Sequence, residues 1–373
     1  MKTPHLKLPI FGYGLRPLVL FLVFAALTPA GCHAKKSKSR VSPVNVEPSA
    51  ALTRGTPVVP DAGTATELLV GLKPTVRVAI IGDQGLGPRP IAVLDLIRDA
   101  AADFLVMVGD FNYEDQPRAW ANQLNRLGSD FPWFAVVGNH DTNQWPEYQR
   151  LISAHQKGIS GANCTGTPGL NASCLYRGVQ LVMSEIGTLG KRADDEAFIK
   201  RELEKSRSPW KLCLWHKNQH DMQVGAKKDE VGWAAYQACQ ASGAIMVAGH
   251  EHSYARSRTL TAVGDSVHGH GAVGPLNRVE VGPGRTFVAV SGLGGKTTRN
   301  FDTSHIADSW WGAYFTADRQ IENGEVTRLP HENDGVGALF LDFGVQGDNK
   351  RGRGRFVTAL DRRIFDDFEI QFQ

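Results

Sequence analysis

The stretch FLVMVGDFNYED, Phe104 to Asp115, joins an apolar run to a cluster of acids, an amide and a phenol. Its first five residues have the length and composition of a buried strand, and the glycine that follows them is typical of a strand end. Asp110 and Tyr113 come directly after that end. Either they belong only to a turn, or the strand carries a carboxylate and a phenol to a metal ion.

Four further apolar runs of the chain end in the same way. Each is followed by residues that can bind a metal: Asp83, Asn139 with His140, His216, and His250 with His252. In open α/β sheets the carboxyl ends of strands meet at one edge, where loops can present side chains to a single crevice. These residues are far apart in the sequence, but we expect them to converge in space.

The apolar runs alternate with amphipathic helical segments in the first half of the chain. Strands are expected at 76–83, 104–110 and 133–141, and helices at 90–102, 117–127 and 145–155. Strand-like runs recur at 179–186, 210–216, 244–252, 285–295, 337–345, 355–362 and 366–372. This order predicts an α/β sandwich. No linker-like break interrupts residues 70–373, so we expect one continuous domain there.

The first 32 residues have the features of a secretory signal. Basic residues precede the apolar run LVLFLVFAAL (18–27), which is too short to span a bilayer comfortably. The run leads into TPAGC, whose end at Cys32 resembles a bacterial lipobox, although Pro29 stands where leucine is usual. We therefore expect export, either to the periplasm or as a membrane-anchored lipoprotein of a bacterium. Lipidation of Cys32, ordinary cleavage with release, and a retained signal anchor all stay open.

Residues 33–69 are polar and lack periodicity, as in a low-complexity tether. The formal net charge of +3 comes largely from the leader, because Lys2, Lys7 and Arg16 have no acid among them. Without these three residues the charge is close to zero, so no basic field predicts nucleic-acid binding. The sequence does not determine the oligomeric state.

Four cysteines follow Cys32, an even number that permits disulfides in an exported chain. Cys164 and Cys174 lie in one polar loop, NCTGTPGLNASC, and are expected to pair with each other. Cys213 lies in a strand-like run and Cys239 in a helix-like run. For these two, a bridge and a pair of buried free thiols are equally consistent with the sequence.

The residues that end the strands suit a two-metal site. Oxygen and imidazole ligands bind hard or borderline metal ions, and two such ions about 3.5–4 Å apart can stabilise both the attacking and the leaving oxygen of a phosphoryl displacement. The glycines before Asp83, Asp110, Asn139 and His250 fit this interpretation, because the backbone would have to turn sharply beside the ligands.

The motifs GD, GDxxY, GNHD, H and GHxH occur in this order in the chain, at 82–83, 109–113, 138–141, 216 and 249–252. As a set they resemble the calcineurin-like metallophosphoesterases, and among those they are most similar to the purple acid phosphatases. The resemblance implies an αββα sandwich, with two mixed β-sheets flanked by helices. It also implies hydrolysis of a phosphate ester by attack of a metal-bound hydroxide.

The same resemblance implies two ligand sets that share Asp110 as a bridge. The first metal would take Asp83, Asp110, Tyr113 and His252, and the second would take Asp110, Asn139, His216 and His250. His140 would lie beside the phosphate, as an acid for the leaving group or a donor to the transition state. Asp141 would orient the ring of His140.

The first motif departs from the pattern of most relatives. Asp83 is followed by Gln84 and Gly85, so the histidine of the common DxH motif is missing, whereas Tyr113 supplies a phenol. Both features match the purple acid phosphatase pattern, which implies Fe(III) at the first site and Fe(II), Zn or Mn at the second. The alternative is that Tyr113 only packs in its loop.

Three further assignments do not follow from the motif set: His220, the aromatic cluster 309–315 and the class of substrate. His220, four residues after His216, could reach the substrate phosphate or be a solvated loop histidine. The aromatic cluster SWWGAYF (309–315) could form a cleft wall, a lid or part of the core. The expected activity is hydrolysis of phosphomonoesters. A phosphodiesterase or phospholipase-like activity, and a surface protein that binds without turnover, are the alternatives.

Overall fold

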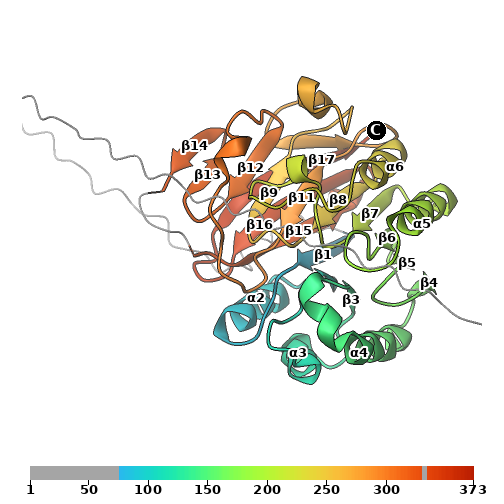
Figure 1. Cartoon of the computed structure of the whole chain (residues 1–373). Helices are drawn as coiled ribbons and strands as arrows, with labels where there is room; N and C mark the ends of the chain where they lie inside the picture. Colours follow the sequence, from blue (N-terminus) through green and yellow to red (C-terminus); the bar gives the residue numbers. More distant parts are fainter. Residues whose placement is uncertain (1–74, 330–333) are drawn as a thin grey trace, which may run out of the picture. The chain divides into compact units, whose positions relative to one another are not determined.

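The computed structural model describes residues 75–329 and 334–373 (Figure 1). The predicted signal segment (1–32), which ends at the lipobox-like Cys32, and the predicted tether (33–69) lie outside the described residues. Among the described helices, none combines the length and apolar character needed to cross a bilayer.

The first sheet has seven strands and contains the stretch around Asp110. Strands β1, β2 and β3 are parallel to one another, whereas β15 and β16 run antiparallel to their neighbours. The order across the sheet is β10 (Arg278–Val281), β17 (Ile364–Phe372), β16 (Arg351–Thr358), β15 (Gly337–Phe343), β1 (Val76–Ile81), β2 (Phe104–Val108) and β3 (Trp133–Val136).

The second sheet has ten strands and is also mixed. Its centre is parallel from β6 through β7 and β8 to β11, and its outer strands are antiparallel. The order is β14 (Glu325–Arg328), β13 (Arg319–Glu322), β12 (Trp311–Phe315), β9 (Tyr254–Ser257), β11 (Val288–Ser291), β8 (Ile245–Ala248), β7 (Trp210–Leu214), β6 (Val179–Met183), β5 (Ala172–Tyr176) and β4 (Asn163–Gly166).

In the described part of the chain, α-helices cover the outer faces of the two sheets. The helices α2 (Pro88–Asp99), α3 (Pro117–Leu124) and α4 (Trp145–Gly158) pack on the seven-stranded sheet, and α5 (Arg192–Lys205) and α6 (Ala234–Ser242) pack on the ten-stranded sheet (Figure 1). Side chains alternate accordingly along β1. Val78 and Ile80 enter the core between the sheets, while Ala79 and Ile81 face the helices. The predicted αββα sandwich is confirmed.

The aromatic cluster 309–315 belongs to the core and not to a lid. Trp311 to Phe315 form β12, and all five residues are buried. The strands β13 and β14 form an antiparallel hairpin that the sequence did not predict. Every residue of β14 is exposed, so no alternation of apolar and polar side chains marks it in the sequence.

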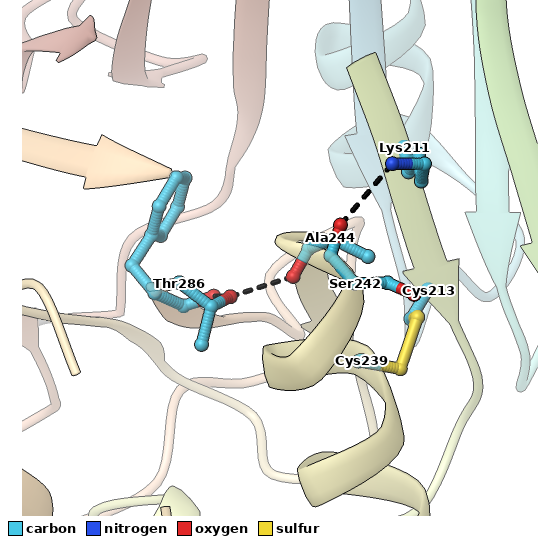
Figure 2. Close-up of a disulfide and its surroundings, with 7 residues drawn as sticks. Lys211, Cys213, Cys239, Ser242, Ala244 and Thr286 are labelled. Carbon is cyan, nitrogen blue, oxygen red and sulfur yellow. Dashed lines mark hydrogen bonds between the residues drawn. A yellow bond between two sulfur atoms is a disulfide. The ribbon is translucent and has the colours of Figure 1, made fainter. Parts of the chain in front are cut away.

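Both pairs of cysteines form disulfides. The predicted Cys164–Cys174 bridge joins the neighbouring strands β4 and β5. The Cys213–Cys239 bridge, which the sequence left open, ties α6 to β7 (Figure 2). Next to it, Lys211 donates a hydrogen bond to the carbonyl of Ser242, so the end of α6 is fixed twice to the strand that leads to His216. Two disulfides favour an oxidising compartment.

Removing the Cys213–Cys239 bridge by two alanine substitutions should lower the free energy of unfolding by about 3.5 kcal/mol, because its cysteines lie 26 residues apart and the bridge restricts the unfolded chain. The Cys164–Cys174 bridge spans only 10 residues, so its double alanine variant should lose about 2.7 kcal/mol. Urea unfolding of the two variants would make the comparison. A larger loss for the shorter loop would contradict the unfolded-chain explanation.

Candidate metal centre

The ends of strands from both sheets meet at one place. Ser291, at the end of β11 in one sheet, accepts a hydrogen bond from the backbone N–H of Gly82 after β1 in the other, at 2.7 Å. A methyl group on Gly109 would lie 2.6 Å from Nδ1 of His216, and one on Gly249 would lie 2.9 Å from Oδ2 of Asp83. These positions require glycine because the strand ends touch here, as the sequence predicted.

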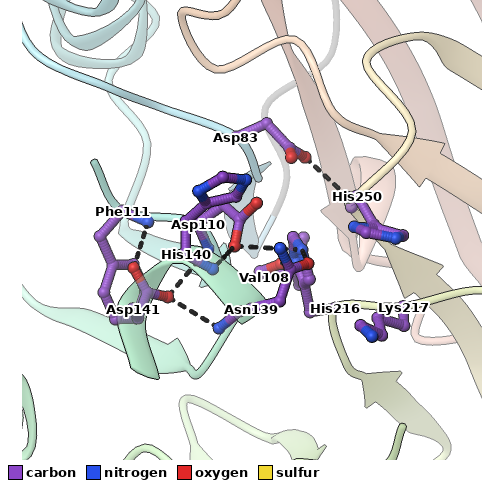
Figure 3. A network of polar contacts seen from close by, with 12 residues as sticks. Asp83, Val108, Asp110, Phe111, Asn139, His140, Asp141, His216, Lys217 and His250 are labelled. Carbon is purple, nitrogen blue, oxygen red and sulfur yellow. Dashed lines mark hydrogen bonds and ion pairs between the residues drawn. The ribbon is translucent and has the colours of Figure 1, made fainter. Parts of the chain in front are cut away.

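Asp110 lies at the centre of this junction (Figure 3). Its Oδ1 is 3.2 Å from Nε2 of His216 and accepts a hydrogen bond of 2.8 Å from the backbone N–H of His140. Ligand atoms of Asp110, His216 and His250 all lie within 4.8 Å of one another, and all three residues are buried. Burial acts to raise the pKa of Asp110, but the imidazole of His216 outweighs it, and the pKa is strongly lowered.

His216 is held in one orientation by the backbone. Its Nδ1 is 2.8 Å from the carbonyl of Val108 and donates to it, so Nε2 is the nitrogen that faces Asp110 and Oδ1 of Asn139, each at 3.2 Å. Burial alone would lower the pKa of His216, but the charge of Asp110 raises it to about 9. A metal that binds Nε2 below this pH must displace a proton, so its affinity should fall as the pH is lowered.

A second group forms around the phenol of Tyr113. Its oxygen lies 3.1 Å from Oδ1 of Asp83, 3.2 Å from Nε2 of His252 and 3.4 Å from Oδ2 of Asp110. The Nδ1 of His252 is 3.0 Å from the carbonyl of Thr297, which again leaves Nε2 facing inward. Burial, followed by the charges of Asp83 and Asp110, raises the pKa of Tyr113 strongly.

Three of the predicted ligands have an unusual backbone. Asp83, Asp110 and His250 have φ angles of 58°, 54° and 67°, in the left-handed region that residues with a Cβ rarely adopt. Asp83 Oδ2 accepts the backbone N–H of His250 at 2.8 Å, which joins two of these turns across the sheets. Such strain is typical of functional sites, where the surrounding fold holds it in place.

His140 and Asp141 do not interact as expected. The side chain of His140 is exposed, and its ring centre lies 4.4 Å from that of Tyr113, at the edge of the junction. Asp141 is fully buried and accepts hydrogen bonds from the backbone N–H groups of Gly138, Asp110 and Phe111 at 2.7–2.9 Å. Its hydrogen bonds in the described structure therefore fix the turn of Asp110 instead of orienting the His140 ring.

The donor set fits metal cations. Asp83 and Asp110 are 0% and 1% exposed, and neither forms an ion pair with a lysine or arginine in residues 75–329 and 334–373. The basic side chains nearest to them are the imidazoles of His252 and His216, at 3.4 and 3.2 Å. Burying two carboxylates without a permanent cation is costly. Metal ions bound by the oxygen and imidazole atoms at these positions would balance the negative charge of the two carboxylates.

Comparison with known families agrees with this geometry. A model of the calcineurin-like phosphoesterase family matches residues 76–254, a range that contains all seven predicted metal ligands. The chain belongs to the calcineurin-like phosphoesterases. Members of this family bind a pair of metal ions, and the buried Asp110, His216 and His250 group accords with such a centre.

This calcineurin-like phosphoesterase is a distant relative of purple acid phosphatases. It is 24% identical over 207 residues to purple acid phosphatase 21 of Arabidopsis thaliana, covering 50% of this chain and 46% of the relative. A purple acid phosphatase from seeds of yellow lupin (Lupinus luteus) has a similar structure, with a TM-score of 0.59, 15% identity, and coverage of 81% of this chain and 55% of that chain. The chain thus spans about half the length of these relatives.

The side chain of His220 forms its hydrogen bond with a loop and not with the residues of the metal centre. It begins the short 3₁₀ helix His220–Met222, and its Nδ1 lies 2.7 Å from the carbonyl of Lys227. Its ring packs beside that of His305, with 4.7 Å between ring centres. No hydrogen bond joins His220 to the other predicted site residues within the described part of the chain. The side chain therefore braces the loop that carries Lys227.

The sequence did not point to several charged residues beside the centre. Lys296 places its Nζ 4.0 Å from the ring centre of Tyr113, and Arg299 donates to the carbonyl of His250 at 3.2 Å. Lys227 is half-buried; burial lowers its pKa, and the charge of nearby Arg299 adds to the effect. Glu230 contacts His250 directly. These residues come from loops without a repeating pattern. Only Lys296 has a local signal, because it directly follows the glycine-rich segment Gly292–Gly295.

Proposed function

We propose that this chain is an exported phosphoesterase with a binuclear metal centre, similar to the purple acid phosphatases, that hydrolyses phosphomonoesters. The observation that carries this proposal is the convergence of Asp83, Asp110 and Tyr113 from one sheet with His216 and His250 from the other. We assign residues 70–373 as the catalytic domain. A protein that only binds a ligand would not need every position of the motif set to be filled.

The two proposed ligand sets share Asp110. Asp83, Tyr113 and His252 would hold the first metal with it, and Asn139, His216 and His250 the second. When bound, such metals lower the pKa of water and polarise a phosphoryl group. Iron at the first position, with iron, zinc or manganese at the second, is the proposed pair.

His140 is the proposed donor to the leaving group or to the transition state. Its exposed ring lies beside Tyr113, so it can reach a substrate that enters from solvent. Its backbone N–H donates to Oδ1 of Asp110 at 2.8 Å, which holds this turn in place. Asp141 would support the role of His140 indirectly, because its carboxylate fixes the turn of Asp110 by accepting backbone N–H groups. The positive charges of Lys227, Lys296 and Arg299 would attract an anionic phosphate ester.

The assay that tests this function uses purified protein loaded with two metal equivalents. We expect hydrolysis of p-nitrophenyl phosphate, and slower hydrolysis of bis(p-nitrophenyl) phosphate. Faster hydrolysis of the diester would favour the phosphodiesterase alternative. Full metal occupancy without turnover of either ester, across a range of pH, would reject the enzyme assignment and leave a binding protein.

Export is part of the proposal. The two disulfides support an oxidising compartment, and the signal-like leader supports secretion. Mass spectrometry of the mature N-terminus would distinguish a lipidated Cys32 from a cleaved, released protein.

Tyr113→Phe should abolish a broad visible absorption of the iron-loaded protein, since a phenolate bound to ferric iron gives that band. The phenol oxygen lies 3.1 Å from Asp83 and 3.2 Å from His252, the two residues proposed to share its metal. Tyr148→Phe is the matched control, because this buried tyrosine bonds to Asn112 and not to the centre. A colourless, iron-free and active wild type would refute the iron assignment but not the family.

A further inference from the structure

His250 differs from the other two predicted histidine ligands in what holds its ring. His216 and His252 each direct Nδ1 to a backbone carbonyl, of Val108 and Thr297. In His250 it is Nε2 that has the outer partner, Oε2 of Glu230 at 2.9 Å. A donated Nε2–H leaves Nδ1 as the unprotonated nitrogen, so His250 would face the centre through the opposite atom of its ring.

Glu230 is itself fixed by the segment that follows β7. Its Oε1 pairs with Nζ of Lys217 at 2.5 Å, and its backbone N–H donates to the carbonyl of Asn218 at 3.1 Å. The side chain of Asn218 in turn donates to the carbonyl of Gly249, the residue before His250, at 2.7 Å. The carboxylate of Glu230 and the ring of His250 are therefore held in fixed positions relative to each other.

A third attachment comes from the outer helix layer. Arg192, the first residue of α5, donates to the backbone carbonyl of Glu230 at 3.0 Å. Glu230 is thus bonded through its N–H, its carbonyl and both carboxylate oxygens.

We propose that Glu230 is a positioning residue that sets the ring orientation and the tautomer of His250 and thereby the affinity of the second metal site. This inference rests on the proposed metal centre. Glu230 contacts Nε2 of His250 but is not part of the group of ligand atoms formed by Asp110, His216 and His250, so we assign it as a partner of the histidine and not as a ligand. A carboxylate that accepts the outer N–H of a ligating histidine makes the ring a better donor to a metal.

The test measures metal binding and not activity. Metal-free wild type, Glu230→Gln and Lys217→Met would be titrated with Zn²⁺ in competition with a chromogenic chelator, and bound zinc would be counted by mass spectrometry. We expect two ions in the wild type. In Glu230→Gln, one ion should bind about 10–100-fold more weakly while the other is unchanged. The weakened step should be the one that His250→Ala removes.

Lys217→Met tests whether Glu230 acts by positioning His250 or only by forming an ion pair with Lys217. It removes the ion pair of Glu230 but leaves the Glu230–His250 contact, so its zinc affinity should stay within about threefold of the wild type. Equal losses in Lys217→Met and Glu230→Gln would assign Glu230 to the ion pair and overturn the proposal. Unchanged zinc binding in Glu230→Gln would also overturn it. A wild type that binds fewer than two ions would instead reject the proposed binuclear centre.

Folding of these variants can be monitored separately. The side chain of Glu230 is 27% exposed, so replacing it by glutamine should leave the urea midpoint nearly unchanged. An affinity loss with an unchanged midpoint would support the positioning role. If the midpoint fell along with the affinities of both ions, Glu230 would be a general structural residue and the proposal would be wrong.

Discussion

Asp110→Asn is expected to lower phosphoester turnover by about 10³-fold or more, because the charge that metal ions supply to such a reaction is worth several kcal/mol. Asn keeps the shape of the side chain and tolerates the left-handed backbone at φ 54°, so the turn should be preserved. What is lost is the negative charge beside His216, 3.2 Å away, and with it a bridge between the proposed metals. Turnover of p-nitrophenyl phosphate and metal content should fall together.

Asp115→Asn is the matched control for this substitution. Asp115 lies five residues further along, also has a left-handed backbone at φ 51°, and is exposed. Turnover and metal content should therefore be close to those of the wild type. An Asp110→Asn protein that still binds two ions and turns over normally would show that the centre lies elsewhere.

Asp342→Asn is expected to cost about 3–5 kcal/mol of unfolding free energy, the largest effect on stability that we predict. Asp342 on β15 is 1% exposed and pairs with two buried arginines. Arg77 on β1 reaches it at 2.7 and 3.0 Å, and Arg355 on β16 contacts it as well. The substitution would remove the buried negative charge that both guanidinium groups share. Urea unfolding of the intact, disulfide-bonded protein would measure the loss.

The control for Asp342 lies in the same sheet. Asp367 on β17 pairs with Arg353 on β16, at 2.6 Å between its Oδ1 and Nε, but these side chains are 38% and 28% exposed. Water already solvates both groups, so Asp367→Asn should cost no more than about 1 kcal/mol. If both variants lost the same free energy, burial would not be the reason for the effect at Asp342.

The strand ends were predictable because two signals coincide there. Each apolar run identifies a buried strand, and each following glycine or polar residue identifies its end, so the sequence alone is enough to select Asp83, Asp110 and His216. The order of the motifs then points to the phosphoesterases. The Cys164–Cys174 bridge is equally predictable from the sequence, since the two cysteines share one short loop.

The hydrogen-bond partners of the site were not predictable. Asp141 binds backbone N–H groups of two different turns, and His220 binds the carbonyl of Lys227, contacts that depend on loop conformation and not on residue type. The Cys213–Cys239 bridge depends on where α6 lies against β7. Glu230, 20 residues before His250, has no sequence feature that links it to that histidine.

The sequence by itself determined the layered α/β fold, the strand ends and the types of atom that gather there, because hydrophobic period and turn residues are local properties of the chain. The tertiary structure decided which nitrogen of each histidine faces inward and what holds it. His216 is oriented by a carbonyl on the facing sheet and His250 by a carboxylate on a loop. Such choices follow from distances between segments far apart in the chain, and only the packing of the two sheets sets those distances.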